Sequence, residues 1–327
     1  MLPFHAVVKE DFAAVNQLII DRLYSDVALV KDIGHYLVEA GGKRLRPLMV
    51  LLTANALGLQ QTSATNSPGQ HIDLATIIEF IHTATLLHDD VVDMSSLRRG
   101  RPTANAEWGN APSVLVGDFL YSRAFQIMVN IGSMEIMAIL SNTTNVIAEG
   151  EVQQLVNAKD PNVSEANYFA VIDKKTAVLF ASACESAAVL CKATTEQRLA
   201  LRTYGSKVGI AFQLVDDALD YTGDTAALGK NVGADLAEGK PTLPLIHAMR
   251  SGTPAQAEII ANAIRNGDAS QLAAILDIVQ ITGAMDYTLN CAREHVREAI
   301  AELQLLPDNI YTQAMHQVAE FALARTY

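Results

Sequence analysis

The sequence predicts an all-α protein, folded as one domain in a large helical bundle over residues 1–327. Apolar residues recur at intervals of three and four along most of the chain, which is the period of an α-helix with one buried face. Alternation of apolar and polar residues, the pattern of a half-buried strand, is scarce, and aromatic residues make up only 6%. Hydrophobic residues make up 50% and charged residues 18%, which is typical of a globular protein.

The helical spacing is clearest in residues 74–92, where apolar residues at positions 74, 77, 78, 81, 84, 87, 91 and 92 fall near one face. Further helices of this kind are predicted along residues 113–131, 134–156, 166–191, 196–221 and 285–303. Residues 41–47, GGKRLRP, are typical of a loop that turns into a helix. Loops are predicted at residues 60–69, at residues 94–112 with a short turn of helix, and at residues 223–241.

The overall charge excludes several classes of function. A formal net charge of −12 argues against nucleic-acid binding and against binding to anionic membrane surfaces, both of which need a basic footprint. The first residues, MLPFHAVVKEDFAAVNQ, do not have the pattern of a signal peptide, and no apolar run is long enough to predict a transmembrane helix. Cys184, Cys191 and Cys291 form no CxxC pair, which favours a reducing cytoplasm.

Two clusters of carboxylates stand at the ends of predicted helices. The stretches LLHDDVVD (residues 86–93) and QLVDDALD (residues 213–220) each contain DDxxD, whose first and last aspartates lie on one helical face. Like charges at this spacing destabilise a helix by about 0.2–0.5 kcal/mol, and anions at a helix C-terminus are unfavourable by about 0.3–1 kcal/mol each. One such cluster is equally well explained as a solvated helix end. Two clusters, each followed by a long loop, favour oxygen ligands for Mg²⁺ and a bound polyphosphate.

Basic residues gather near these clusters, although the chain has only 24 lysines and arginines. Each group has a simple alternative explanation, as a solvated turn, a surface run or the start of a helix. Together they favour a cleft that binds small anions. The groups are Lys43, Arg44 and Arg46; Arg98, Arg99 and Arg101; Lys174, Lys175 and the adjacent Thr176; and Lys230 and Lys240.

The combination of motifs resembles the trans-isoprenyl diphosphate synthases. The matching stretches are LLHDDVVD followed by RRG, FQLVDDALD, GGKRLRP and GKPTLPL, and the resemblance extends from about residue 10 to the C-terminus. It implies a class I isoprenoid synthase bundle with a central active-site cavity. The stretches EFIHTATLLHDDVVD, GNAPSVLVGDFLYSRAF, VIAEGEVQQL and LGKNVGADLAEGKPTLPLIHAM look most like the bacterial members that make octaprenyl diphosphate for the side chains of quinones such as ubiquinone.

The resemblance implies a role for each matching residue. Asp89 and Asp93 would bind Mg²⁺ with support from Asp90, and Asp216 would bind a third Mg²⁺ with Asp217 and Asp220 acting directly or through water. These six aspartates, Arg98 and Lys175 form the expected catalytic set. The allylic diphosphate would contact Arg98, Lys175, Thr176, Gln213, Lys230 and Lys240. The diphosphate of isopentenyl diphosphate would contact Lys43, Arg46, His82 and Arg99.

Residues upstream of the first aspartates are expected to set product length. Ala84 and Thr85 are small, whereas short-chain members of the family tend to carry bulky aromatic residues there, so the growing tail can pass. Helix geometry gives about 22 Å of wall between Asp89 and Leu74. Ile81 would line this wall, and Met128 is a candidate for its floor; for any one of these residues taken singly, ordinary core packing is the simpler explanation.

The resemblance therefore implies a magnesium-dependent, homodimeric prenyltransferase, and the cysteine pattern favours a cytoplasmic location. The enzyme would condense farnesyl diphosphate with successive isopentenyl diphosphates to octaprenyl diphosphate, with nonaprenyl and heptaprenyl products close behind. A class I terpene cyclase is an alternative, although its second metal site usually mixes Asn, Ser or Thr with Glu, and this chain has DDALD. A non-catalytic partner subunit is another, although such subunits tend to lose an aspartate motif.

Overall fold

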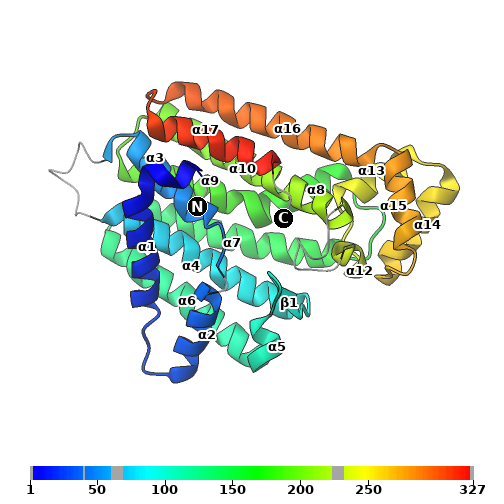
Figure 1. The fold of residues 1–327 in the computed structure, drawn as a ribbon, viewed down its shortest axis with the longest axis horizontal. Helices are drawn as coiled ribbons and strands as arrows, with labels where there is room; N and C mark the ends of the chain where they lie inside the picture. Colours follow the sequence, from blue (N-terminus) through cyan, green and yellow to red (C-terminus); the bar gives the residue numbers. More distant parts are fainter. Residues whose placement is uncertain (1–2, 40, 60–68, 223–231, 325–327) are drawn as a thin grey trace. The chain divides into compact units, whose positions relative to one another are not determined.

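A computed structural model describes residues 3–39, 41–59, 69–222 and 232–324 of the chain. The all-α prediction is confirmed, because regular structure in these ranges is helical apart from one two-stranded hairpin (Figure 1). The described chain divides into two compact units. The first comprises Met1–Thr144, Leu179–Gly205 and Ile300–Val318, and the second comprises Asn145–Val178, Ser206–Ala299 and Ala319–Tyr327.

The first unit is centred on a long helix, α4 (Gln70–Val92), which packs against α6 (Asn110–Ile131), α3 (Leu45–Ala56) and α1 (Lys9–Arg22). In Figure 1, α4 and α6 run side by side. Every position of α3 except Arg46 is buried, as expected for a helix that is apolar on all sides. The unit also contains η1 (Pro3–Val8), α2 (Ala28–Glu39), β1 (Leu97–Arg98), β2 (Arg101–Pro102), α5 (Ala104–Trp108) and η4 (Leu303–Leu305).

Four helices pass from one unit into the other along the chain: α7 (Met134–Asn157), α10 (Thr195–Thr222), α16 (Ala284–Glu302) and α17 (Ile310–Leu323). A fifth, α9 (Val178–Leu190), begins at the last residue of a segment of the second unit. The second unit adds α8 (Glu165–Ile172), η3 (Asp173–Ala177), α12 (Ala234–Ala237), α13 (Leu243–Ser251), α14 (Pro254–Asn266) and α15 (Leu272–Ile281). Its core contains Tyr221, Leu236, Leu245, Ile260, Ile264 and Ile275.

The predicted helices agree with the observed ones to within a few residues, and the short turn of helix expected in residues 94–112 is confirmed as α5. Two predicted loops were partly wrong, because residues 94–112 also contain the β1–β2 hairpin and residues 234–237 of the third predicted loop form α12. The hairpin turns at Arg99 and Gly100, whose φ angles of 53° and 73° are those of a two-residue type I′ turn. Its two-residue strands are too short to show alternation in the sequence. Residues 60–68 and 223–231 of the predicted loops lie outside the described residues.

None of the described helices is by itself long and apolar enough to cross a membrane. One pair, Leu272–Ile281 with Ala284–Leu305, reaches the required length and composition only as two helices bent by 64°.

Candidate functional site

The first aspartate motif lies where α4 ends, as predicted, with Asp93 as its C-cap. Asp89 and Asp93 are partly exposed, whereas Asp90 is 3% exposed. The guanidinium of Arg98 donates three hydrogen bonds to the carboxylate of Asp90. Nε donates to Oδ1 at 2.9 Å and to Oδ2 at 3.1 Å, and Nη2 donates to Oδ1 at 2.6 Å. The motif therefore splits into two outward carboxylates and one inward carboxylate that holds an arginine.

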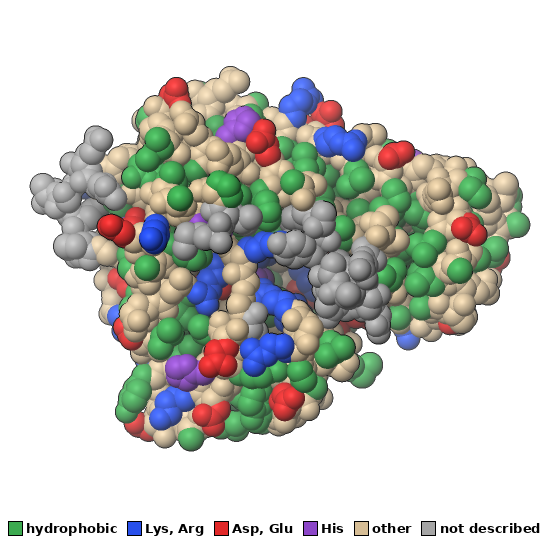
Figure 2. All heavy atoms as spheres, in the orientation of Figure 1, with side chains coloured by type: hydrophobic (Ala, Val, Ile, Leu, Met, Phe, Trp, Pro, Cys, Tyr) green, Lys and Arg blue, Asp and Glu red, His purple; other side chains and the backbone are tan. Residues whose placement is uncertain are grey.

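The β1–β2 hairpin follows α4 in the chain and contains three arginines, Arg98, Arg99 and Arg101. Asn105 Nδ2 donates to the carbonyl oxygens of Asp90 and Ser95, and the Thr103 hydroxyl donates to Ser95 at 2.7 Å, so the return of the chain is fixed to the end of α4. Burial alone would lower the pKa of Arg98, but its hydrogen bond to Asp90 and the charges of the motif raise it overall. Figure 2 shows lysine and arginine side chains gathered on the face that includes the hairpin.

A cavity of about 60 Å³ lies beside α4 in the first unit, large enough for several water molecules. Its lining includes His82, Arg98 and Arg99, all predicted to bind diphosphate, together with Arg44 and Glu79. Arg99 donates from Nη1 to the Gly41 carbonyl, and a Cβ on Gly42 would lie 2.6 Å from that same Nη1. The φ angle of 141° at Gly42 favours glycine there, and a larger residue would also have to displace the end of the Arg99 side chain.

The cations of GGKRLRP separate in the structure. Arg46 Nη1 lies 3.2 Å from His82 Nε2, and its guanidinium carbon stacks 4.3 Å above the Phe180 ring. Arg44 instead donates to Asn16 and lies 3.7 Å from Glu79 Oε1. Burial raises the pKa of Glu79, against the lowering effect of Arg44, Arg46 and Arg99. Lys43 is partly buried, and its carbonyl contacts the His5 ring at 3.2 Å.

His82 is neutral in this setting. Arginine has only donors, so His82 Nε2 must accept from Arg46, which leaves the ring proton on Nδ1. Burial lowers the pKa of His82 well below its usual value, and the positive charges of Arg46, Arg99 and Arg98 lower it further. A neutral, accepting imidazole can hold an arginine in place without adding a charge.

The depressed pKa of His82 predicts a specific pH dependence of stability. As the pH falls below about 6.5, the unfolded chain binds a proton at this ring before the folded protein does, so the free energy of unfolding decreases. His82→Gln keeps a neutral acceptor and cannot titrate. Urea denaturation at a series of pH values between about 7.5 and 5 should show the wild type losing more stability than the variant. A constant difference between the two across this range would contradict the assignment, because the other histidines are common to both.

The predicted chain-length residues occupy different environments. Ala84 and Ile81 are 0% exposed and Met128 is 1% exposed, so in this structure they are packed core positions. Thr85 is partly exposed, and its hydroxyl donates to the His82 carbonyl at 2.8 Å. His88 packs toward α6, where a Cβ on Gly117 would lie 2.3 Å from its Nε2. The roles in product length stay predictions.

The second aspartate motif, in the second unit, lies near the end of α10 and is more deeply buried. Asp216 is partly exposed, Asp217 is 3% exposed and Asp220 is 0% exposed. Asp220 Oδ2 accepts from the backbone amide of Asp235 at 3.1 Å, in the first turn of α12. Asp220 thus caps α12 rather than facing solvent. Helical spacing placed Asp216 and Asp220 on one face, but only the packing of α12 determines that they differ in exposure.

Asp217 forms a network with three side chains. The Tyr168 hydroxyl donates to Oδ2 at 2.5 Å and Gln213 Nε2 donates to Oδ1 at 2.7 Å, while Thr176 Oγ1 donates to Gln213 Oε1 at 2.9 Å. Burial raises the pKa of Asp217 well above its usual range, and the charge of Asp235 adds to this, against the two hydrogen bonds. Burial also raises the pKa of Tyr168, which keeps its hydroxyl protonated as a donor.

The lysine pair inside the predicted 166–191 helix lies in a π-helical turn, η3 (Asp173–Ala177). Such turns are frequent at functional sites because they re-aim side chains within a helix. Lys175 Nζ donates to Glu151 Oε2 at 2.7 Å and to Gln154 Oε1 at 2.8 Å, both on α7. A Cβ on Gly150 would lie 2.9 Å from the Lys175 amide nitrogen, so glycine lets α7 approach this turn.

Of the two remaining predicted cations, Lys230 and Lys240, the structure describes Lys240. Lys240 Nζ pairs with Glu238 at 2.5 Å, just before α13, whose Pro244 lies in the first turn as expected for a helix start. Lys230 lies outside the described residues.

The two outward carboxylates suit a hard cation for which the protein supplies only part of the coordination shell. Asp89 and Asp93 offer oxygen ligands alone, and among the residues described no group of three or more His, Cys, Asp or Glu side chains converges to hold a metal ion. Mg²⁺ fits this arrangement, since it is usually held by one or two carboxylates, with waters and substrate phosphates completing its shell. The site can therefore be completed by a phosphorylated substrate.

Sequence reasoning missed several residues that hold these groups. Glu79 could have been noticed as a lone charge in the apolar stretch before His82. Tyr168, Asn105, Glu151 and Gln154 carry no local signal, because their partners are 10 to 49 residues away in the chain.

The chain is similar to known proteins over nearly its whole length. The sequence profile described as polyprenyl synthetase matches residues 27–281. Octaprenyl diphosphate synthase of Haemophilus influenzae is 51% identical over 97% of this chain and 94% of that protein. The all-trans-nonaprenyl-diphosphate synthase (geranyl-diphosphate specific) of Rhodobacter capsulatus is 48% identical over 98% of this chain and 96% of that protein. The crystal structure of polyprenyl synthase from Caulobacter crescentus CB15, complexed with calcium and isoprenyl diphosphate, matches with a TM-score of 0.93 and 45% identity, over 99% of this chain and 97% of that chain.

Proposed function

Because this chain belongs to the polyprenyl synthetase family, we propose that it is a trans-prenyltransferase that makes octaprenyl diphosphate for quinone side chains. Its substrates are farnesyl diphosphate and successive molecules of isopentenyl diphosphate. The observation that carries the proposal is the end of α4, where two outward carboxylates stand beside the arginine-lined cavity that contains His82. This arrangement suits a metal-bound diphosphate with a second anion close by.

In each round of elongation the allylic C1–O bond breaks and the diphosphate leaves with the electron pair. The double bond of isopentenyl diphosphate then attacks C1, and loss of a proton, with the released diphosphate as the base, restores an alkene. Bound Mg²⁺ would supply Lewis-acid stabilisation of the negative charge on the leaving group. Asp89 and Asp93 would hold it in the first unit and Asp216 in the second, and we propose three ions per active site.

The protein's own cations would stabilise the same charge. Arg98 is fixed by Asp90 and Lys175 by Glu151 and Gln154, so neither has to reorganise when negative charge develops on the allylic diphosphate. Thr176, Gln213, Lys230 and Lys240 would contact the same diphosphate. Lys43, Arg46, His82 and Arg99 would bind the diphosphate of isopentenyl diphosphate.

The test is to incubate the protein with farnesyl diphosphate, labelled isopentenyl diphosphate and Mg²⁺, and to size the dephosphorylated products. A main product of eight isoprene units is expected. A nonaprenyl product would support the proposed reaction but show that the proposed product length is wrong, consistent with the similarity to the Rhodobacter capsulatus enzyme. Cyclised hydrocarbon formed without isopentenyl diphosphate would indicate a terpene cyclase. No turnover until a second chain is added would indicate a partner subunit.

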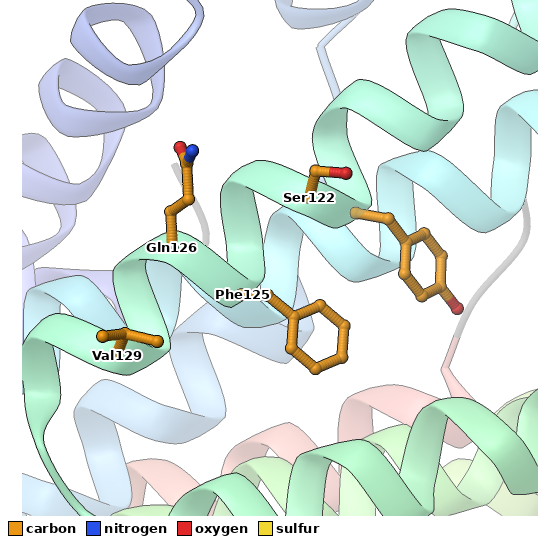
Figure 3. A pocket seen from close by; sticks show the side chains of 5 residues that line it. Ser122, Phe125, Gln126 and Val129 are labelled. Carbon is orange, nitrogen blue, oxygen red and sulfur yellow. The ribbon is translucent and has the colours of Figure 1, made fainter.

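We further propose that the protein is a homodimer that associates through α6. An open pocket along this helix is lined by Tyr121, Ser122, Phe125, Gln126 and Val129, of which the last four are labelled in Figure 3. Val129 is 65% exposed, and Leu115 on the same helix is 66% exposed. Exposed apolar positions on one helical face favour burial against another protein surface. A cytoplasmic location is also proposed, supported by the free thiols of Cys184, Cys191 and Cys291.

Val129→Asp is expected to shift the protein from dimer toward monomer, because it places a charge within the proposed apolar contact. Sedimentation equilibrium would measure the dissociation constant, and an increase of about 10-fold or more is expected. Ile281→Asp, at another strongly exposed apolar position on α15, is the matched control and should leave the dimer intact. Equal effects of both substitutions, or none from the first, would place the interface elsewhere.

A further inference from the structure

Four side chains of the second unit form one continuous hydrogen-bonded chain. It runs from Tyr168 on α8 to Asp217 on α10, from Asp217 to Gln213 one turn earlier on α10, and from Gln213 to Thr176 in the π-helical turn. Its links measure 2.5, 2.7 and 2.9 Å. Tyr168, Asp217 and Thr176 are each less than 9% exposed, whereas Gln213 is partly exposed.

The direction of each hydrogen bond follows from the chemistry of the groups. The Tyr168 hydroxyl donates to Oδ2 of Asp217 and the Gln213 amide nitrogen donates to Oδ1, so both oxygens of Asp217 act as acceptors. The amide oxygen of Gln213 must then face Thr176, which donates to it. If the amide were flipped, its oxygen would lie against the carboxylate of Asp217, with like partial charges in contact. Asp217 therefore fixes the orientation of the Gln213 amide, with its nitrogen toward Asp217 and its oxygen toward Thr176.

We infer that Tyr168 and Asp217 are positioning residues for Gln213, so that the second amide hydrogen of Gln213 is presented to an oxygen of the allylic diphosphate. This inference rests on the proposed function. It differs from the role expected of Asp217 by resemblance, in which Asp217 acts on a metal ion directly or through water. It also adds Tyr168, which the sequence did not single out.

The surroundings of the three aspartates support this division of roles. Each oxygen of Asp217 already accepts a side-chain donor, and the group is 3% exposed, so hydrated metal has little access to it. Asp220 is 0% exposed and accepts from the Asp235 amide. Asp216 is the partly exposed member of the motif and remains the candidate metal ligand.

Tyr168→Phe tests the inference because it removes one donor and retains the ring. Without its anchor, Asp217 is expected to hold Gln213 less firmly, and KM for farnesyl diphosphate should rise about 10- to 100-fold, with a smaller change in kcat. The Mg²⁺ concentration for half-maximal activity should stay that of the wild type. Tyr287→Phe is the matched control, since Tyr287 donates to Glu165 at 2.6 Å in the surface cluster with Arg250, and its KM should be unchanged.

Asp217→Asn and Asp216→Asn separate positioning from metal binding. Asp217→Asn should raise KM for farnesyl diphosphate with unchanged Mg²⁺ dependence, whereas Asp216→Asn should raise the Mg²⁺ requirement. A wild-type KM in Tyr168→Phe, or an Mg²⁺ requirement raised as much by Asp217→Asn as by Asp216→Asn, would overturn the inference. Thermal unfolding of each variant shows whether a change in KM accompanies loss of the fold.

The proposed function and the inference about Gln213 can fail independently, and different measurements detect each failure. If the wild type does not join farnesyl diphosphate to isopentenyl diphosphate, the proposed function falls. Calorimetric titration with inorganic diphosphate and Mg²⁺ then decides the inference, because weaker binding by Tyr168→Phe but not by Tyr287→Phe supports it and equal binding by all three proteins overturns it.

Discussion

Asp89→Ala is expected to lower kcat/KM for chain elongation by about 10³-fold at saturating Mg²⁺, the size of effect seen when one electrostatic contact to a reacting group is lost. Asp89 is partly exposed at the C-terminal end of α4, and Asp93, the C-cap of the helix, is partly exposed as well. Within the motif, the proposed metal site uses these two carboxylates, since Asp90 is paired with Arg98. Steady-state rates with labelled isopentenyl diphosphate would measure the loss.

The same variant is expected to remain folded with a stability close to that of the wild type. An anion in the last turn of a helix opposes the helix dipole, but the charge of Asp89 also attracts Arg98, so the two effects of its removal offset each other. Asp90→Ala should lower the stability, because it removes the carboxylate that accepts three hydrogen bonds from the Arg98 guanidinium. Asp21→Ala, at the exposed C-terminal end of α1, is the matched control and should keep full activity. Near-normal turnover by a folded Asp89→Ala protein would remove this residue from the mechanism.

Thr85→Phe is expected to convert the enzyme to one that releases short prenyl diphosphates. Thr85 lies one helical turn before Asp89, about 6 Å along the axis, so an aromatic ring there would meet the tail of the growing chain soon after the first additions. Because Thr85 is partly exposed, the ring can be accommodated without displacing core side chains. Sizing the labelled products after dephosphorylation measures the effect, and the first condensation should keep its rate.

The neighbouring position shows why Thr85 is the sharper test. Ala84 is 0% exposed, so Ala84→Phe would overpack the core and cost about 1–3 kcal/mol of stability before any effect on the product. Thr282→Phe is the control for a new aromatic ring at a partly exposed threonine, since the Thr282 hydroxyl also bonds to a carbonyl of its own helix, at 2.7 Å. An unchanged octaprenyl product from folded Thr85→Phe would exclude Thr85 as a determinant of length.

Much of the fold was predictable because helical periodicity is local. The helix at residues 74–92 begins only four residues earlier in the structure, and α10 and α16 agree with their predicted bounds to within one residue at each end. The place of each DDxxD at a helix end was also local information. The β1–β2 hairpin was missed because two-residue strands have no measurable period, and the π-helical turn was missed because one such turn leaves the helical spacing of residues 166–191 almost unchanged.

The sequence by itself determined the helices, the two aspartate clusters and the cations that accompany them, since these depend on residues within a few turns of one another. The tertiary structure alone decided which members of each cluster remain available. Asp90 is held by Arg98, Asp220 caps α12 and Asp217 is held by Tyr168, 49 residues away. Aspartates of the same motif therefore have different roles. Their burial and their hydrogen-bond partners depend on segments distant in the chain, which helical spacing does not predict.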